Sequence, residues 1–86
     1  MARILIIDDD DLMGEFLARK LRISGHDIEW ATTLTNAKAF LSAEPFDLVL
    51  LDVNLPDGNG LTFLPWIQDS ANPPEVIIIT GQGDPD

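Results

Sequence analysis

Three short apolar runs are the clearest pattern along the chain. They are Ile4-Leu5-Ile6-Ile7, Leu48-Val49-Leu50-Leu51 and Val76-Ile77-Ile78-Ile79. Uninterrupted runs of this length are typical of parallel strands that are covered on both faces, whereas strands with one solvated face alternate. The segment Asp27–Ala31 does alternate, and its charged positions predict an edge strand that discourages further pairing.

Apolar residues recur at helical spacing between these runs. A first helix is predicted from about residue 11 to 24, with Gly25 as its stop. Its apolar stripe is predicted to consist of Leu12, Met13, Phe16, Leu17, Leu21 and Ile23. A second helix is expected to begin near Thr33 or Thr35, either of which can cap it, and to end before Pro45. Its inward residues are predicted to be Ala37, Phe40 and Leu41.

A third helix is predicted after Gly60, with Leu61, Leu64 and Ile67 as its apolar set. Pro65 lies badly in that helix, because it cannot donate to the Leu61 carbonyl, so we expect a late start or a kink. The resulting order is β-α-β-α-β-α-β, which predicts an α/β doubly wound parallel sheet. The 86 residues allow one small domain, which is expected to span residues 1–86.

The composition excludes several classes of function. The 15 acidic and 5 basic residues give a formal net charge of −10, which argues against direct nucleic-acid binding by this segment. The chain has no cysteine, hence no thiolate metal site and no cysteine nucleophile. No signal-peptide pattern is visible and no apolar stretch approaches the roughly 20 residues of a membrane span, so a cytoplasmic protein is expected.

Acidic residues gather where the predicted strands end. Asp8 and Asp9 follow the first run, Asp52 follows the second and Thr80 follows the third. In a parallel sheet these ends share one edge, which is where doubly wound folds bind their ligands. Three carboxylates in one pocket need a counter-charge, and Mg²⁺ with its oxygen ligands fits. The next two acids, Asp10 and Asp11, suit a helix start.

Three motifs together resemble the receiver domain of bacterial two-component response regulators. They are ILIIDDDD, FDLVLLDVNLPDGNGL and VIIITG, and the resemblance covers residues 3–84. It implies a flavodoxin-like sheet and a phosphorylation-dependent switch that regulates transcription through an output domain. The opening and the Thr-Gly-Gln-Gly-Asp ending look most like receivers of the nitrogen-regulator type.

The resemblance also implies site residues. Asp52 would accept the phosphoryl group of a histidine kinase, and Asp9 would bind Mg²⁺ directly while Asp8 acts through water. The backbone carbonyl of Asn54 would be a further metal ligand. Thr80 would hydrogen-bond the phosphoryl oxygen, with Gly81 leaving space beside it.

Other polar residues are interpreted as structural. The turn residues are Asp57, Gly58, Asn59 and Gly60, and His26 is interpreted as an exposed loop residue.

One departure from the family concerns its phosphate-binding lysine, which follows a fifth strand. Lys20 and Lys38 fall in the first two predicted helices and cannot replace it. A truncated receiver that lacks its last helix-strand-helix is therefore expected. In the family's strand order, residues 76–79 would then form an exposed apolar edge, which predicts a homodimer or higher assembly.

Two other classes of function compete with this hypothesis. A phosphatase of the haloacid-dehalogenase type also uses an aspartyl nucleophile and Mg²⁺, but it requires a second aspartate where Asn54 stands. Its nucleophile also follows the first strand rather than the third. A flavodoxin-like binding module would need a phosphate-binding loop after the first strand, where four aspartates would repel a flavin phosphate.

Overall fold

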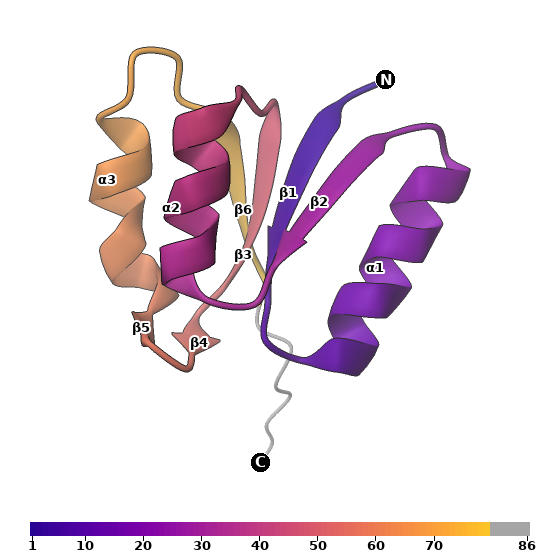
Figure 1. Ribbon diagram of the computed structural model, residues 1–86, viewed down its shortest axis with the longest axis horizontal. Helices are drawn as coiled ribbons and strands as arrows, with labels where there is room; N and C mark the ends of the chain where they lie inside the picture. The colour runs from indigo at the N-terminus through magenta and orange to yellow at the C-terminus, as the bar shows by residue number, and fades with distance from the viewer. Residues whose placement is uncertain (80–86) are drawn as a thin grey trace.

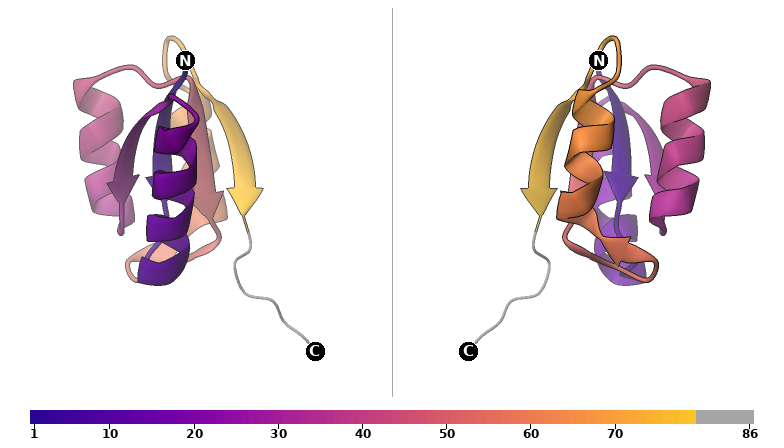
Figure 2. Two further views of the ribbon diagram at one scale, coloured as in Figure 1. Left: turned by 90° about the vertical axis from the view of Figure 1, so that its right-hand side faces the viewer. Right: turned by 90° about the vertical axis from the view of Figure 1, so that its left-hand side faces the viewer.

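The computed structural model describes residues 1–79. A parallel sheet with strand order β2-β1-β3-β6 lies between α1 on one face and α2 and α3 on the other (Figure 1). The elements are β1 (Arg3–Ile7), α1 (Asp11–Ile23), β2 (Asp27–Ala31), α2 (Leu34–Ala43), β3 (Leu48–Asp52), β4 (Asn54–Leu55), β5 (Gly58–Asn59), the 3₁₀ helix η1 (Gly60–Phe63), α3 (Leu64–Gln68) and β6 (Glu75–Ile79). The predicted doubly wound α/β sheet is confirmed, with β2 and β6 at its edges (Figure 2).

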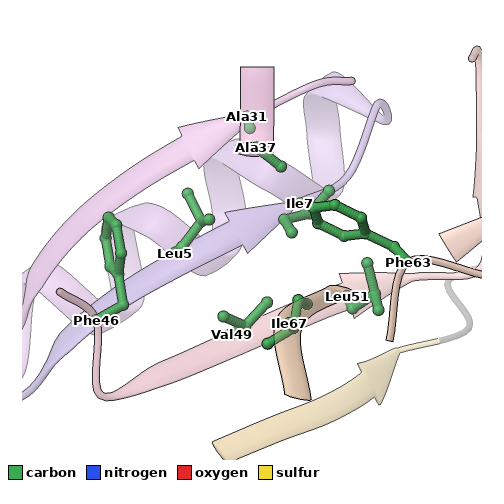
Figure 3. Close-up of a cluster of buried hydrophobic side chains, with 9 residues drawn as sticks. All are labelled: Leu5, Ile7, Ala31, Ala37, Phe46, Val49, Leu51, Phe63 and Ile67. Carbon is green, nitrogen blue, oxygen red and sulfur yellow. The ribbon is translucent and has the colours of Figure 1, made fainter. Parts of the chain in front are cut away.

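The apolar runs are buried on both faces because alternate residues serve different layers. Leu5 and Ile7 point toward α2 and α3, where they join a cluster that also contains Ala31, Ala37, Phe46, Val49, Leu51, Phe63 and Ile67 (Figure 3). Ile4 and Ile6 point toward α1 and pack with Ala18, Ile28 and Leu50. Each fully buried branched side chain of this kind contributes about 1.5–3 kcal/mol. The sheet therefore has two cores, one on each side.

The predicted apolar stripe of α1 is wrong in part. Leu12, Phe16 and Ile23 are exposed, at 82%, 56% and 77%. Successive residues of a helix are 100° apart, so these three lie about half a turn from the buried Gly14 and Ala18. The remaining predicted positions, Met13, Leu17 and Leu21, are half-buried. The six apolar residues thus form two groups about a third of a turn apart, and only the group next to Gly14 and Ala18 is partly covered.

The predicted helix boundaries are largely confirmed. Thr33 caps α2, with its Oγ1 accepting from the Asn36 N–H at 3.1 Å. Gly25 follows α1 with φ of 93°, a conformation that favours glycine. Pro65 lies in the first turn of α3, which begins late, after η1. Leu61 is exposed rather than inward, because the 3₁₀ geometry of η1 buries Phe63 instead.

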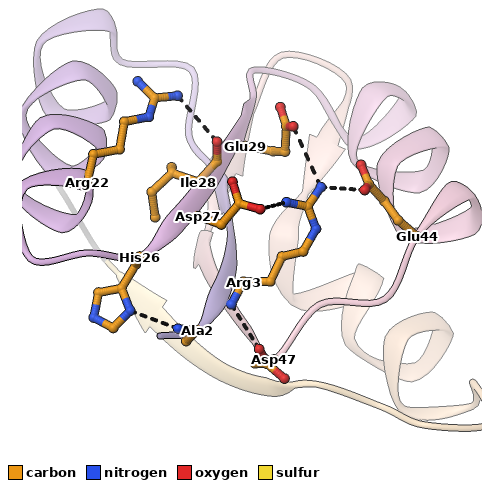
Figure 4. Close-up of polar contacts among 9 residues, drawn as sticks. All are labelled: Ala2, Arg3, Arg22, His26, Asp27, Ile28, Glu29, Glu44 and Asp47. Atoms are coloured by element: carbon orange, nitrogen blue, oxygen red, sulfur yellow. Dashed lines mark hydrogen bonds and ion pairs between the residues drawn. The ribbon is translucent and has the colours of Figure 1, made fainter.

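An ion-pair network fastens the end of the sheet where β1 begins (Figure 4). The Arg3 guanidinium pairs with Asp27, Glu29 and Glu44. His26 is half-buried, which corrects its interpretation as an exposed loop residue, and its Nδ1 accepts from the Ala2 N–H at 3.0 Å. These contacts tie β1, β2 and the end of α2 together at one end of the molecule.

The edge strand β6 exposes apolar side chains. Ile77 and Ile78 are 51% and 37% exposed, whereas Val76 and Ile79 pack against the two cores. Trp66 in α3 is 39% exposed and stacks on Phe63 with ring centroids 5.2 Å apart. Within residues 1–79, no helix has both the length and the apolar character that crossing a membrane requires.

Candidate functional site

Asp8, Asp9 and Asp52 lie together at the carboxyl end of the sheet. Ile7 and Leu51 are paired across β1 and β3, so the residues that follow them emerge side by side. One carboxylate oxygen from each of the three aspartates lies within 4.8 Å of the others. Asp8 and Asp52 are buried and Asp9 is exposed. Parallel topology thus produces the convergence that the strand-end pattern predicts, and we refer to these three residues as the acidic cluster.

Asp8 is the most strongly perturbed member of the acidic cluster. Its Oδ1 accepts from the Asp10 N–H at 3.0 Å, whereas its buried Oδ2 has no hydrogen-bond donor among residues 1–79. Burial raises the pKa of the Asp8 carboxyl; the Asp10 N–H offsets this in part, and the negative charges of Asp52 and Asp10 raise it further. A buried oxygen without a donor, next to two other carboxylates, fits a hard divalent cation such as Mg²⁺.

Asp10 and Asp11 begin α1, as predicted. Asp10 is the N-cap, and its Oδ1 accepts from the N–H groups of Leu12 and Met13 at 3.0 and 3.3 Å. Asp11 lies in the first turn, where a negative charge suits the helix dipole. The four consecutive aspartates therefore divide into two that face the site and two that stabilise the helix behind it.

A contact that the sequence did not reveal supports the backbone of Asp8. The Trp30 indole Nε1 donates to the Asp8 carbonyl oxygen at 2.8 Å, from β2 across to the end of β1. The indole lies directly against Gly14 of α1, where a Cβ atom would overlap the ring. Neither residue carries a recognisable motif, so the pair becomes visible only in three dimensions.

The loop after Asp52 folds back as the β4-β5 hairpin. Asn54 pairs with Asn59 and Leu55 with Gly58. The Gly60 N–H donates to the Val53 carbonyl at 2.6 Å, and a Cβ atom on Gly60 would collide with the Asp52 carbonyl oxygen. Gly60 therefore permits a close return of the chain behind Asp52.

The other predicted site residues are Asn54, Thr80 and Gly81. Asn54 lies in β4 of this hairpin, two residues after Asp52, and the metal-binding role of its carbonyl stays a prediction. Thr80 and Gly81 lie outside the described residues. Asp57, interpreted from sequence as a turn residue, lies at the hairpin turn, and its carboxylate also binds the first turn of α2.

Comparison with known proteins assigns the family. A model of the response regulator receiver domain matches residues 4–86. The chain belongs to this family. The resemblance carried by the three sequence motifs is therefore confirmed, and these residues form a receiver domain of the kind found in two-component response regulators.

Curated relatives of this receiver domain include regulators of motility and transcription. The swarming motility regulation protein RssB of Serratia marcescens is 39% identical over 80 residues, covering 92% of this chain and 36% of RssB. The CpxR homolog of Haemophilus influenzae, a transcriptional regulatory protein, is 37% identical over 84 residues. That match covers 98% of this chain and 36% of the CpxR homolog. The receiver chain thus spans about a third of the length of these relatives.

Solved receiver structures have the same fold. The MaeR response regulator bound to beryllium trifluoride superposes with a TM-score of 0.85 at 34% identity, covering 98% of this chain and 70% of MaeR. A CheY-like receiver domain from Methanospirillum hungatei superposes with a TM-score of 0.89 at 31% identity, covering 98% of this chain and 67% of that one. The flavodoxin-like class of the sheet is therefore confirmed.

Proposed function

We propose that this receiver domain is a phosphorylation-dependent switch that accepts a phosphoryl group on Asp52. The observation that carries the proposal is the acidic cluster, in which Asp52 lies within 4.8 Å of Asp8 and Asp9 and Asp8 has a buried oxygen without a donor. Such an arrangement suits a carboxylate nucleophile whose charge must be offset before a phosphoryl group can approach.

The chemistry would be a transfer between two proteins. A carboxylate oxygen of Asp52 attacks phosphorus, the P–N bond of a phosphohistidine breaks, and the released imidazole of the histidine kinase takes up a proton. Mg²⁺, when bound, would neutralise charge between Asp52 and the incoming phosphoryl oxygens. Asp8, Asp9, Asp52 and the Asn54 carbonyl would hold the ion, and Thr80 would bind a phosphoryl oxygen. The chain would act as acceptor rather than as an enzyme with turnover.

The output of the switch would be transcriptional, through parts of the protein other than this segment. Support comes from relatives that are named as transcriptional regulatory proteins and extend well beyond the matched region. The net charge of −10 argues against nucleic-acid binding by the receiver domain itself, so DNA would be bound by a different domain. A cytoplasmic location accords with its family and with a kinase as donor.

The phosphatase alternative of the haloacid-dehalogenase type has less support. Asn54 stands two residues after the nucleophile, where that class requires an acidic proton donor. Asp52 ends β3, whereas that class places its nucleophile after the first strand. Family membership favours the receiver hypothesis independently.

Phosphorylation of Asp52 is testable with a small phosphoryl donor. The chain is incubated with acetyl phosphate, with and without Mg²⁺, and its intact mass is measured at intervals. We expect one added phosphoryl group per chain when Mg²⁺ is present, and none in Asp52→Asn. Labelling that persists in Asp52→Asn would contradict the assignment of the acceptor.

The exposed edge of the sheet supports a second, separate proposal, that copies of this chain associate through β6. Among residues 1–79, β6 pairs with β3 alone, and its Ile77 and Ile78 are exposed. Unpaired strand edges with apolar side chains favour pairing with another chain. Analytical ultracentrifugation of the chain and of Ile77→Lys is expected to show an assembly that the substitution weakens. A compact monomer at high concentration would contradict it.

A further inference from the structure

The carboxylate of Asp57 joins the loop after Asp52 to the start of α2. Its Oδ1 accepts from the Leu34 N–H at 2.9 Å, and its Oδ2 accepts from the Thr35 N–H at 3.1 Å and the Thr35 Oγ1 at 3.0 Å. The partners are 22 and 23 residues away in sequence. One side chain therefore makes three hydrogen bonds between two segments that the chain itself does not connect closely.

These hydrogen bonds complete the cap of α2. The first N–H groups of a helix have no partner within the helix. Thr33 serves the Asn36 N–H, and Asp57 serves the two preceding groups, those of Leu34 and Thr35. A negative charge at this end also suits the helix dipole. In agreement, the Leu34 N–H and then the Thr35 groups hold the pKa of Asp57 below its usual value.

The same hydrogen bonds fix the tip of the β4-β5 hairpin. Asp57 lies in the turn between Leu55 and Gly58, which are paired with each other. The base of the hairpin is fastened by the Gly60 N–H to the Val53 carbonyl. Asn54 lies between these two attachments. The backbone that follows Asp52 is thus held at both ends, by the Gly60–Val53 hydrogen bond at the base of the hairpin and by Asp57 at its tip.

We propose that Asp57 is a positioning residue that fixes the hairpin carrying Asn54 and thereby sets the affinity of the acidic cluster for a divalent cation. The inference rests on the proposed metal site and adds a residue with no direct contact to the ion. Asp57 acts through the backbone: its three hydrogen bonds restrict the loop before the ion arrives, so less conformational entropy is lost on binding. Without them, the loop must be ordered by the ion itself.

Substitutions at two exposed aspartates separate positioning from charge. Asp57→Ala removes all three acceptor contacts, whereas Asp57→Asn keeps the Oδ1 acceptor for the Leu34 N–H but loses both the charge and the Oδ2 acceptor for the Thr35 N–H. The matched control is Asp69→Ala, because Asp69 is also exposed and its side chain makes no hydrogen bond within the described residues. Both alanine variants lose one negative charge, so a general effect of net charge on cation binding would affect them equally.

The measurement is a titration of each folded chain with MgCl₂, followed by backbone amide chemical shifts in ¹H–¹⁵N spectra. We expect Asp57→Ala to weaken Mg²⁺ binding about tenfold, the lower end of the range for groups that orient metal ligands. Asp69→Ala is expected to stay within about twofold, since one exposed charge is screened by salt. Asp57→Asn, which keeps the contact with Leu34 but not the acceptor for the Thr35 N–H, is expected to fall between Asp69→Ala and Asp57→Ala. If Asp57→Ala does not fold, Thr35→Val removes one contact and is expected to weaken binding about threefold on the same reasoning.

Unchanged Mg²⁺ affinity in Asp57→Ala, or in Thr35→Val where the alanine variant is unfolded, would overturn the inference alone. Equal weakening in Asp57→Ala and Asp69→Ala would also overturn it, because charge would then explain the effect. Absence of Mg²⁺ binding by the unsubstituted chain would overturn the proposed metal site and this inference together. The two failures are therefore distinguishable.

Discussion

The indole of Trp30 donates a hydrogen bond of 2.8 Å to the main-chain carbonyl of Asp8. The bond runs from the edge strand β2 to the point where β1 ends and the acidic cluster begins. It gives the buried Asp8 carbonyl a partner and holds the backbone of a predicted metal-binding residue from the side. The edge strand thus contributes to the site without placing a charged group in it.

Replacement of Trp30 by phenylalanine is expected to destabilise the fold by about 1 kcal/mol, the net worth of a typical hydrogen bond. The aromatic bulk is largely kept, so the lost N–H accounts for most of the effect. Urea unfolding followed by far-ultraviolet circular dichroism measures the change. Trp66→Phe is the control, because that indole stacks on Phe63 and makes no hydrogen bond within residues 1–79. Equal losses in both variants would contradict a special role for the bond.

The contact between Gly14 and Trp30 predicts that Gly14→Ala destabilises the unsubstituted chain but stabilises a chain in which Trp30 is replaced by valine. A Cβ atom on Gly14 would overlap the indole, so Gly14→Ala is expected to cost about 1–3 kcal/mol in the unsubstituted chain. With Trp30→Val the space is open, and the same change should stabilise α1 by up to about 1 kcal/mol, because alanine favours helices. Four unfolding curves complete the cycle. An identical effect of Gly14→Ala in both backgrounds would refute the steric explanation.

The sequence predicted the sheet well because buried parallel strands leave a simple pattern. The strand-end positions of Asp8, Asp9 and Asp52 then followed from parallel topology alone. The α1 stripe was misjudged because Leu12, Phe16 and Ile23 are apolar yet lie opposite the small residues that contact the sheet. Small buried residues such as Gly14 give no hydrophobic signal.

Contacts between distant segments could not be predicted from the sequence. Trp30 reaches Asp8 over a separation of 22 residues, and Asp57 reaches Leu34 over 23. Both depend on which loops the fold brings together. Asp57 carried a local signal that indicated a turn, and that signal contains no information about the helix it also caps.

Gly60→Ala is expected to disturb the chain directly behind Asp52. The added methyl group would collide with the Asp52 carbonyl, and a backbone atom cannot move aside cheaply. We expect a loss near the upper end of the overpacking range of about 1–3 kcal/mol, with amide shifts concentrated at residues 52–54. Gly25→Ala is the comparison, because its site is open and its cost comes from φ of 93° alone. If the amide shifts of Gly60→Ala were found around residues 23–27, as expected for Gly25→Ala, and not at residues 52–54, the steric explanation would be wrong.

Asp8→Asn is expected to stabilise the metal-free protein and to abolish Mg²⁺ binding. The buried Oδ2 has no donor within the described residues, and a partnerless buried acceptor costs about 1–3 kcal/mol. Burial raises the pKa of Asp8 in the folded state, so its ionisation opposes folding. The advantage of the asparagine variant should therefore grow as the pH rises from about 4, the ordinary carboxyl value, toward neutrality. Thermal unfolding with EDTA tests this, and a destabilised variant would contradict it.

Asp57 should show the opposite dependence on pH. Its pKa is lowered in the folded state, first by the Leu34 N–H, so its ionised form favours folding. That contribution is present above the unfolded value of about 4 and is lost as the pH falls through the lower folded pKa. The stability difference between the unsubstituted chain and Asp57→Asn should therefore shrink below about pH 4. Denaturant midpoints of the two proteins across this range measure it, and a constant difference would refute the assignment.

Carboxylates gather at both ends of β1, and the source of the positive charge that offsets them differs between the two ends. At its start, Arg3 supplies a covalently attached cation to Asp27, Glu29 and Glu44. At its end, Asp8, Asp9 and Asp52 lie together, and no basic side chain within residues 1–79 forms an ion pair with them. The first end thus carries a permanent counter-charge, whereas a counter-charge for the other end would have to come from the surrounding solution. The five residues of β1 thereby connect an end whose charges are fixed by the protein to an end whose net charge would change when a cation binds or leaves.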